Sequence, residues 1–362
     1  MKKTIGATFN SRDNSFHFLR FFAASLVIFD HSFPLYGHSR GYFDLPLRVA
    51  GSLALPTFFI ISGFLITKSW LDSPDLFSYL KKRCLRILPG LAAVTLFAVF
   101  IIGPMATTLG LKEYFTNSHT WSYLLTAAML IMTSLPGVFV HNTFSGAVNG
   151  SLWTLPYEFW MYLFIAGFGL IGMLSQQRRW LIFLFTLLVL VGTELFRRGI
   201  LSSSIPFLHV YLASHFTQLG GYFILGSLFY LYQEKIVLNG WFMVMALAVF
   251  ALPFKFESLE LLHYLSLPYI VLYFAFAVNI KLFKNFGKYG DFSYGMYIYA
   301  FIVQQSLVHL FGKSINFLFF NFLTFTITFL LAFLSWNLIE KQAMKLKNVN
   351  IKFPFLFFKV SR

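Results

Sequence analysis

The stretch "FHFLRFFAASLVIFDHSFPLYG", residues 16–37, decides what kind of protein this is. Most of it is apolar, and it is long enough to cross the hydrocarbon core of a bilayer, which needs roughly 20 helical residues. It nevertheless carries Arg20, Asp30 and His31. An Arg or Asp at the centre of a membrane helix costs roughly 2.5–3.5 kcal/mol, so ionisable residues kept there indicate a functional site.

The whole chain shares this apolar character. Of its 362 residues, 58% are hydrophobic and only 11% are charged, whereas a soluble domain carries about 25% charged residues. The composition predicts an all-α integral membrane protein. The net charge of +15 indicates topology signals and contact with anionic lipids; nucleic acid is not expected, because the aromatic residues lie in apolar runs. The single Cys84 excludes a cysteine metal cluster, and no metal site is predicted.

Ten apolar runs have about the length of a membrane span, and an eleventh candidate, residues 121–139, ends in Pro-Gly. With both termini cytoplasmic, ten spans place 21 Lys and Arg residues inside and seven outside, as the positive-inside rule requires. If 121–139 also crossed, basic loops on one side of it would face outward. We therefore predict about ten transmembrane helices and a re-entrant or interfacial helix at 121–139 on the outer side. The ten runs are 16–36, 50–70, 87–105, 154–174, 180–196, 213–232, 236–253, 264–281, 292–312 and 316–338.

The chain shows no internal repeat, no low-complexity tract and no hydrophilic linker. We therefore expect one membrane-embedded domain over residues 1–362. Its core covers about 15–341, and a short basic cytoplasmic tail follows at 342–362. No cleavage site follows the first apolar run, so that run is expected to be a retained span and not a removed signal peptide.

Arg20 and His31 are eleven positions apart, which is roughly 16 Å along a helix, and they project to within roughly 20° of the same face. Arg20 is expected near the cytoplasmic side and His31 deeper in the membrane. This arrangement suits a long anionic ligand that reaches into the membrane. The alternatives are an arginine whose charge reaches the interface and a hydrogen-bonded core histidine. Asp30 points roughly 100° away from His31, and no catalytic role is expected for it.

A second basic signal is "KKRCLRILPG", residues 81–90. Arg83 and Arg86 are three positions apart and share a helix face. Two forked guanidiniums on one face suit a phosphate group. The alternative is an ordinary positive anchor at the cytoplasmic end of a span.

Two further stretches carry polar groups inside apolar runs. In "GSLWTLPYEFWMYLF", residues 150–164, Glu158 lies one or two turns into the apolar zone, without a basic neighbour in sequence. Such a carboxylate is a functional candidate that could orient a histidine or bind sugar hydroxyls, or it could pair with an outer arginine such as Arg48. In "GDFSYGMYIYAFIVQQ", residues 290–305, Tyr294 and Tyr297 belong to a polar aromatic stripe. That stripe could line a sugar site or extend an interfacial belt.

Together these stretches resemble the acyltransferase-3 family, integral-membrane O-acyltransferases that modify bacterial cell-surface sugars. The resemblance runs from about Ser15 to Lys341. It rests on "LRFFAASLVIFDH", "FFIISGFLI", "KKRCLRILP" and "SLWTLPYEFWMY", in that order, and on the closing elements "FSYGMYIYAFIVQQ" and "LSWNLIEK". Many members carry a histidine in the late helix where this chain has Ala300, so the main chemistry is expected to rest on His31.

The resemblance implies transfer of an acyl group, most often acetyl, from acyl-CoA to a hydroxyl of a cell-surface or lipid-linked saccharide at the bacterial cytoplasmic membrane. His31 would act as a general base or carry the acyl group itself. A proton-coupled transporter or flippase of a lipid-linked sugar is the alternative class, although repeated halves are not seen. The expected site residues are His31 and Glu158 for catalysis; Arg20, Arg83 and Arg86 for the acyl donor; and Ser151, Trp153, Tyr294 and Tyr297 for the substrate.

Overall fold

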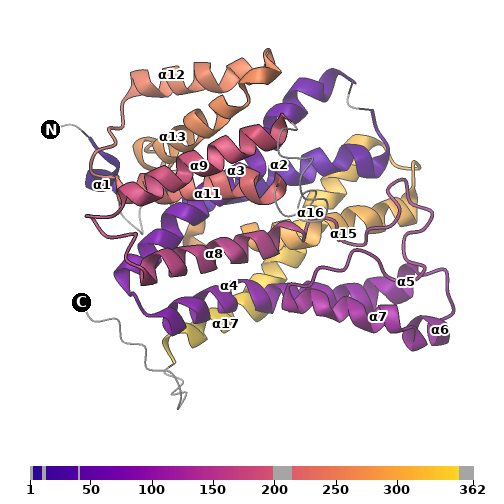
Figure 1. Ribbon diagram of the computed structural model, residues 1–362. Coiled ribbons are helices and arrows are strands. Elements are labelled where there is room, and N and C mark those ends of the chain that lie inside the picture. Colours follow the sequence, from indigo (N-terminus) through magenta and orange to yellow (C-terminus); the bar gives the residue numbers. More distant parts are fainter. Residues whose placement is uncertain (1–2, 10–13, 40, 199–213, 350–362) are drawn as a thin grey trace.

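The computed structural model describes residues 3–9, 14–39, 41–198 and 214–349, and its regular structure there is entirely helical (Figure 1). Two isolated β-bridges, Thr4 with Val237 and Thr107 with Val138, are the only strand-like pairings among these residues. Arg12, which the charge count included, and residues 350–362 of the predicted basic tail lie outside the described residues.

Each of the ten predicted apolar runs overlaps one helix of 12–29 residues, because each combines apolar side chains with few helix-breaking residues. Prolines inside the helices, such as Pro34, Pro56 and Pro89, do not end them. The ten helices are α2 (Phe16–Tyr36), α3 (Asp44–Asp72), α4 (Leu76–Phe97), α8 (Thr154–Leu170), α9 (Trp180–Arg197), α11 (Ser214–Leu231), α12 (Gly240–Ala251), α13 (Leu261–Ala277), α15 (Ser293–Phe311) and α16 (Phe317–Ser335).

The expected number of membrane spans is not met. Among the described residues, four helices are long and apolar enough to cross a membrane: Phe16–Tyr36, Asp44–Asp72, Leu76–Ala106 and Phe317–Lys345. A fifth would be Leu261–Ala277 taken together with Lys281–Lys288, although that pair is bent by 99°. Several of the remaining helices are too short, because a straight crossing needs roughly 20 residues and α12 has 12. The apolar runs therefore predict where helices form better than they predict which helices span.

Residues 121–139 form no helix of spanning length. They begin in the short helix α7 (Ser118–Ser122), continue in the 3-10 helix η3 (Tyr123–Ala128), and then leave helical structure. Met129 adopts a positive φ of 66°, and Gly137 one of 70°. A side chain at Gly137 would also crowd the hydroxyls of Thr107 and Thr108. The turn at Pro136-Gly137 therefore ties this segment to the end of the preceding long helix.

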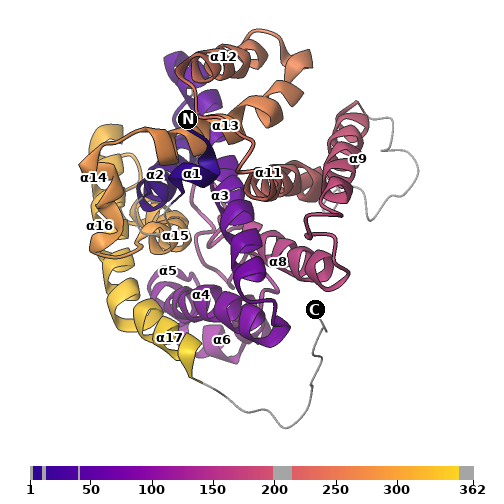
Figure 2. The same cartoon turned by 90° about the vertical axis from the view of Figure 1, so that its left-hand side faces the viewer.

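Helix α3 lies in the middle of the molecule, with α2 and α15 on one side and α8 and α11 on the other (Figure 2). Its contact with α11 depends on glycines. A Cβ on Gly63 would overlap the carbonyl oxygen of Phe223, and a Cβ on Gly226 would overlap that of Ile60. Small residues thus let the two backbones touch, as is common between membrane helices.

Helices α2, α15 and α16 pack around a second small core that contains Ala24, Ile28, Ala300 and Ala332, all of them buried. The remaining elements are short. They are α1 (Ile5–Thr8), η1 (Gly41–Phe43), η2 (Ala98–Ile102), α5 (Gly103–Ala106), α6 (Leu111–Thr116), η5 (Leu252–Phe254), η6 (Glu257–Leu259), α14 (Lys281–Lys284), η7 (Phe286–Lys288), η8 (Trp336–Glu340), α17 (Lys341–Lys345) and η9 (Leu346–Asn348).

Candidate active site

Arg20 of α2 and Arg86 of α4 meet at one carboxylate, that of Asp291, which precedes α15. Asp291 Oδ2 lies 3.2 Å from Arg20 Nη1 and 2.5 Å from Arg86 Nη2. Ser293 Oγ donates to the other oxygen at 2.5 Å. Burial by itself would raise the pKa of Asp291, but the Arg86 and Arg20 guanidiniums hold it well below its usual range. We call Arg20, Arg86 and Asp291 the arginine cluster.

Two further groups border the arginine cluster. His17 Nδ1 lies 3.7 Å from Asp291, and Glu340 Oε2 lies 3.8 Å from Arg86 Nη1. Ser335 Oγ donates to the other oxygen of Glu340 at 2.9 Å. Asp291 and Glu340 were not among the expected site residues. The available signal was weak: each is a single carboxylate at the end of an apolar run, far in sequence from the arginines.

Arg83 does not share the partners of Arg86, although both lie on one helix face. Its guanidinium carbon lies 5.9 Å from the ring centre of Tyr79 and 5.8 Å from that of Tyr162. Its Nε is buried without a hydrogen-bond partner in the described part of the chain. The pair that shares an anion in the structure is therefore Arg20 with Arg86, on two different helices.

Glu158 of α8 faces α3. Its Oε1 accepts a hydrogen bond from Ser62 Oγ at 2.8 Å and another from the Tyr162 hydroxyl at 2.6 Å. Within the described segments Glu158 forms no ion pair, and Arg198 pairs instead with Glu194. The carboxylate is thus held by neutral donors, and it contacts the same tyrosine that lies over Arg83.

His31 of α2 has no hydrogen bond to any described residue. Its ring lies edge-on to that of Phe301, with centroids 5.6 Å apart, and its Nδ1 is buried without a partner. A buried nitrogen left in this way typically costs about 1–3 kcal/mol. The ring lines a cavity of about 70 Å³ together with Asp30, Trp153 and Tyr297. We call it the histidine cavity.

Two other cavities adjoin the histidine cavity. The first, of about 30 Å³, is lined by Arg20, Glu158, Tyr294 and Tyr297; we call it the arginine cavity. It shares Leu55 and Tyr297 with the histidine cavity. The second, of about 540 Å³, is the large cavity, and it shares four lining residues with the histidine cavity: Asp30, Gly51, Leu55 and Trp153. His31 therefore lies between the arginine cavity and the large cavity.

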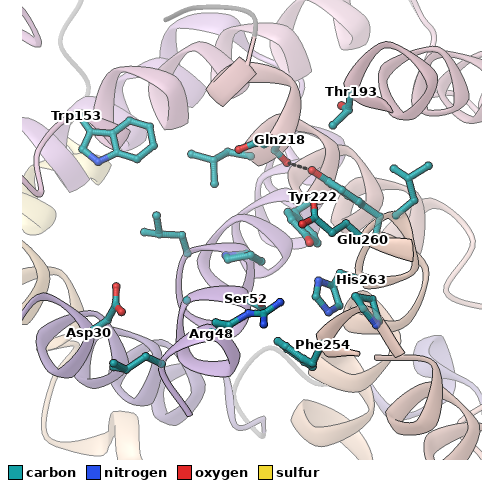
Figure 3. A pocket seen from close by; sticks show the side chains of 18 residues that line it. Asp30, Arg48, Ser52, Trp153, Thr193, Gln218, Tyr222, Phe254, Glu260 and His263 are labelled. Atoms are coloured by element: carbon teal, nitrogen blue, oxygen red, sulfur yellow. Dashed lines mark hydrogen bonds between the residues drawn. The ribbon is translucent and has the colours of Figure 1, made fainter. Parts of the chain in front are cut away.

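The large cavity carries charged and aromatic side chains from several elements (Figure 3). In the close-up, Asp30 and Trp153 lie on one side, Glu260 and His263 lie on the other, and Arg48 lies between them. His263 Nε2 lies 3.1 Å from the Phe250 carbonyl oxygen. Sequence reasoning assigned Trp153 to a substrate but did not find this grouping, because its members come from α2, α3, the segment just before α8 and the start of α13.

The remaining expected substrate residues connect helices through their polar atoms. The Tyr297 hydroxyl donates to the Ser151 carbonyl oxygen at 2.5 Å and lies 2.6 Å from Thr154 Oγ1. The Tyr294 hydroxyl donates to the Ile87 carbonyl oxygen at 2.8 Å. Both tyrosine rings line the arginine cavity. Ser151 is almost fully buried and lines none of the three cavities.

Ala300, at the position where many members of the resembled family carry histidine, lies in the small core between α2 and α16. It lines none of the three cavities. Over the described ranges, no three His, Cys, Asp or Glu side chains are grouped closely enough to hold a metal ion.

Comparison with known proteins agrees with the resemblance. A family model described as an acyltransferase domain matches residues 13–338. An O-acetyl transferase of Shigella phage Sf6 is 29% identical over 341 residues, which cover 91% of this chain and 96% of that protein. Nodulation protein 10 of Rhizobium leguminosarum bv. viciae is 29% identical over 368 residues, covering 92% and 94% of the two chains. No solved structure matches the chain.

Proposed function

The chain belongs to the acyltransferase-3 family and is an acyltransferase enzyme, and we propose that it transfers an acetyl group from acetyl-CoA to a hydroxyl of a cell-surface or lipid-linked saccharide. The observation that supports this most directly is the position of His31. It lies between a small cavity that reaches the arginine cluster and the large cavity on the other side. A donor and an acceptor could therefore approach one imidazole from opposite directions.

The arginine cluster suits the phosphates of the donor. CoA is anionic, and an arginine offers five N–H donors. Arg20 and Arg86 can therefore keep a hydrogen bond to Asp291 while other N–H groups turn to a phosphate. Arg83, which lies over two tyrosine rings, would add positive charge nearby. The slender pantetheine arm would then extend along α2 from Arg20 toward His31.

His31 is our candidate for the catalytic base. A neutral imidazole can accept a proton near neutral pH. As the acceptor hydroxyl attacks the thioester carbonyl carbon, its proton passes to His31, and the new ester bond replaces the carbon–sulfur bond. The departing thiolate then takes the proton from His31. The vacant Nδ1 and the absence of a hydrogen bond to any described residue leave the ring available for this cycle.

Glu158 is the second candidate on the reaction path. It lines the arginine cavity and is fixed by Ser62 and Tyr162. It contacts neither His31 nor the large cavity, so it is better placed to accept a hydrogen bond from an amide N–H of the pantetheine arm than to orient the imidazole.

The large cavity is the proposed acceptor site. Its volume of about 540 Å³ lies within the range of small-molecule pockets, roughly 300–1,000 Å³. The carboxylates of Asp30 and Glu260 can bind sugar hydroxyls, and the indole of Trp153 offers a face for a sugar ring. Asp30 and Trp153 also line the histidine cavity, so a hydroxyl bound near them can reach His31.

We propose a bacterial cytoplasmic membrane location with both termini inside and with the large cavity reached from outside; the positive-inside count over the ten apolar runs supports this topology on the condition that the shorter helices also cross. We further propose a single domain in which the shorter helices lie in the membrane beside the four or five candidate spans. A cysteine at the exposed position of Ser118, in a Cys84→Ser chain, would then react with an impermeant thiol reagent added from outside.

Purified protein in detergent tests the proposed reaction. Given radiolabelled acetyl-CoA and candidate saccharides, it should form a labelled glycan ester that a His31→Gln variant does not form. Release of free CoA without an esterified glycan would contradict saccharide transfer. Transport of a lipid-linked sugar by vesicles, without any product, would favour a carrier.

A further inference from the structure

An apolar groove shares no lining residue with the three cavities. It has a volume of about 840 Å³ and is bordered by α2, α14, η7, the segment before α15, and α16. We call it the phenylalanine groove. Its walls include Phe21, Phe286, Phe292, Phe329 and Phe333, and Lys281 lies on its lining.

The phenylalanine rings form a continuous wall. The Phe21 ring centre lies 4.9 Å from that of Phe286 and 6.3 Å from that of Phe329. Phe292 in turn lies 5.6 Å from Phe329 and 5.8 Å from Phe333. Ring contacts at these distances hold the side chains in place. The groove therefore presents a fixed hydrocarbon surface of the kind that an acyl chain can follow.

Lys281 lines the groove, and Lys288 directly precedes Tyr289, which also lines it; both lysines follow a bend in the backbone. After α13 the chain turns by 99°, so residues 281–288 run across the direction of that helix. Lys281 and Lys288 are exposed and form no ion pair with any described residue. Tyr289, which is 78% exposed, lies beside them on the groove lining. Lysine and tyrosine next to an apolar surface are typical of the boundary between lipid tails and head groups.

We propose that the phenylalanine groove is a binding site for one anionic phospholipid. Its acyl chain would lie against the phenylalanine wall, and its phosphate would lie at Lys281 and Lys288. Charge complementarity favours this occupant, because juxtamembrane lysines attract anionic head groups. A second copy of the chain fits less well, since a symmetric interface would bring the same lysines face to face.

The bound lipid would touch the segment that precedes the arginine cluster. Gly287 packs so closely on His17 that a Cβ would overlap the imidazole ring, and His17 lies 3.7 Å from Asp291. Tyr289 and Phe292 of the groove flank Asp291 in sequence. The site does not depend on the proposed donor or acceptor, so its test does not depend on the reaction.

Lipid competition tests the proposal. The full chain would be reconstituted into nanodiscs with equal phosphatidylglycerol and phosphatidylcholine of the same acyl chains. It would then be transferred to mild detergent, and the lipid retained per chain would be counted by native mass spectrometry. Wild type should retain mainly phosphatidylglycerol. Lys281→Ala with Lys288→Ala should lower that retention about 25-fold, since each lysine near a membrane surface contributes about fivefold.

Two further variants separate the groove from general surface charge. Lys341→Ala with Lys345→Ala removes the same charge from α17 and should retain phosphatidylglycerol as wild type does. Leu282→Trp narrows the groove without changing charge and should lower retention of both lipids. Equal retention of the two lipids by wild type would overturn the proposal, as would equal loss in both double variants or a lipid-free dimer. If the Lys281→Ala, Lys288→Ala chain does not fold, the loss of both lipids in Leu282→Trp still tests the groove.

Discussion

The polar side chains at the two ends of α2 differ in whether they have hydrogen-bond or ion-pair partners. At Arg20, the guanidinium shares the buried Asp291 carboxylate with Arg86, and Ser293 binds the second carboxylate oxygen. At His31, the ring rests edge-on to Phe301, and its Nδ1 has no hydrogen-bond partner among the described residues. A charge buried in a low-dielectric region needs an opposite charge beside it. A neutral ring can remain without a hydrogen-bond partner at a smaller cost in folding free energy.

This difference separates two tasks on one helix. Two arginines held by one carboxylate keep their geometry and one net positive charge, so the cluster can bind a further anion without large rearrangement. A ring without a partner is less restrained and keeps a nitrogen free to accept a proton. The contrast predicts that substitutions at the His31 end change turnover, whereas substitutions at the Arg20 end change donor affinity and stability.

The largest effect is expected for His31→Gln. Glutamine keeps a polar side chain of similar length but cannot accept a proton at neutral pH, so acyl transfer should fall at least about 100-fold in kcat, as is usual when a general base is removed. His309→Gln, at an exposed histidine on α15, is the matched control and should keep wild-type turnover. Glycan acetylation at equal protein level measures both. If His31→Gln retains more than a tenth of wild-type kcat, His31 is not the general base.

The next effect is expected for Arg86→Lys. Lysine keeps the charge that balances Asp291 and Glu340 but loses the planar fork that can hold two oxygens at once. The KM for acetyl-CoA should rise about tenfold or more, with little change in kcat, because charge-assisted hydrogen bonds contribute about 1.5–3 kcal/mol. Arg83→Lys should raise the KM for acetyl-CoA less, because Arg83 does not share the Asp291 carboxylate. Equal KM values for the two variants would break the distinction drawn between these arginines.

A smaller effect is expected for Glu158→Gln. The amide oxygen can still accept hydrogen bonds from Ser62 and Tyr162, so packing at α3 should persist. Acyl transfer should fall less than tenfold if Glu158 only holds the donor arm. Its kcat and KM can be measured in the same assay as those of His31→Gln. A loss of kcat as large as that of the histidine variant would make Glu158 a partner in proton transfer.

The smallest change is expected in the pH dependence of stability between pH 5 and 8. The pKa of Asp291 is held well below its usual range by Arg86 and Arg20, against the effect of burial. Its stabilising contribution is therefore complete above the unfolded-state pKa of about 3.9 and is lost only as the pH falls through the lower folded-state value. The difference in unfolding midpoint between wild type and Asp291→Asn should not decline as the pH falls from 8 to 5.

Asp72→Asn, at an exposed ion pair with Lys68, is the control for that measurement and should shift the midpoint little, because exposed pairs contribute about 0–1 kcal/mol. A difference for Asp291→Asn that declines already between pH 7 and 5 would mean that the carboxylate titrates there and is not held ionised by the arginines.

Local pattern predicted the helices and the residues that share a helix face. Arg20 and His31 lie on α2 as expected, but residues 121–139, predicted as one re-entrant or interfacial helix, are helical only to Ala128. The number of spans was overestimated, since hydropathy detects an apolar run but not how much of it becomes one straight helix. The 99° bend after α13 and the 12 residues of α12 depend on how the chain packs.

The sequence by itself determined an apolar, helical chain with an arginine and a histidine at two levels of its first long helix, because helical periodicity and hydropathy act over neighbouring residues. Only the tertiary structure decided the partners. Asp291 lies 271 positions from Arg20 and 205 from Arg86, and Ser62 lies 96 positions from Glu158. No local rule relates such distant residues. The packing of the helices brings them together. A charge inside an apolar bundle is tolerated only where that packing places an opposite charge or a hydrogen-bond donor beside it.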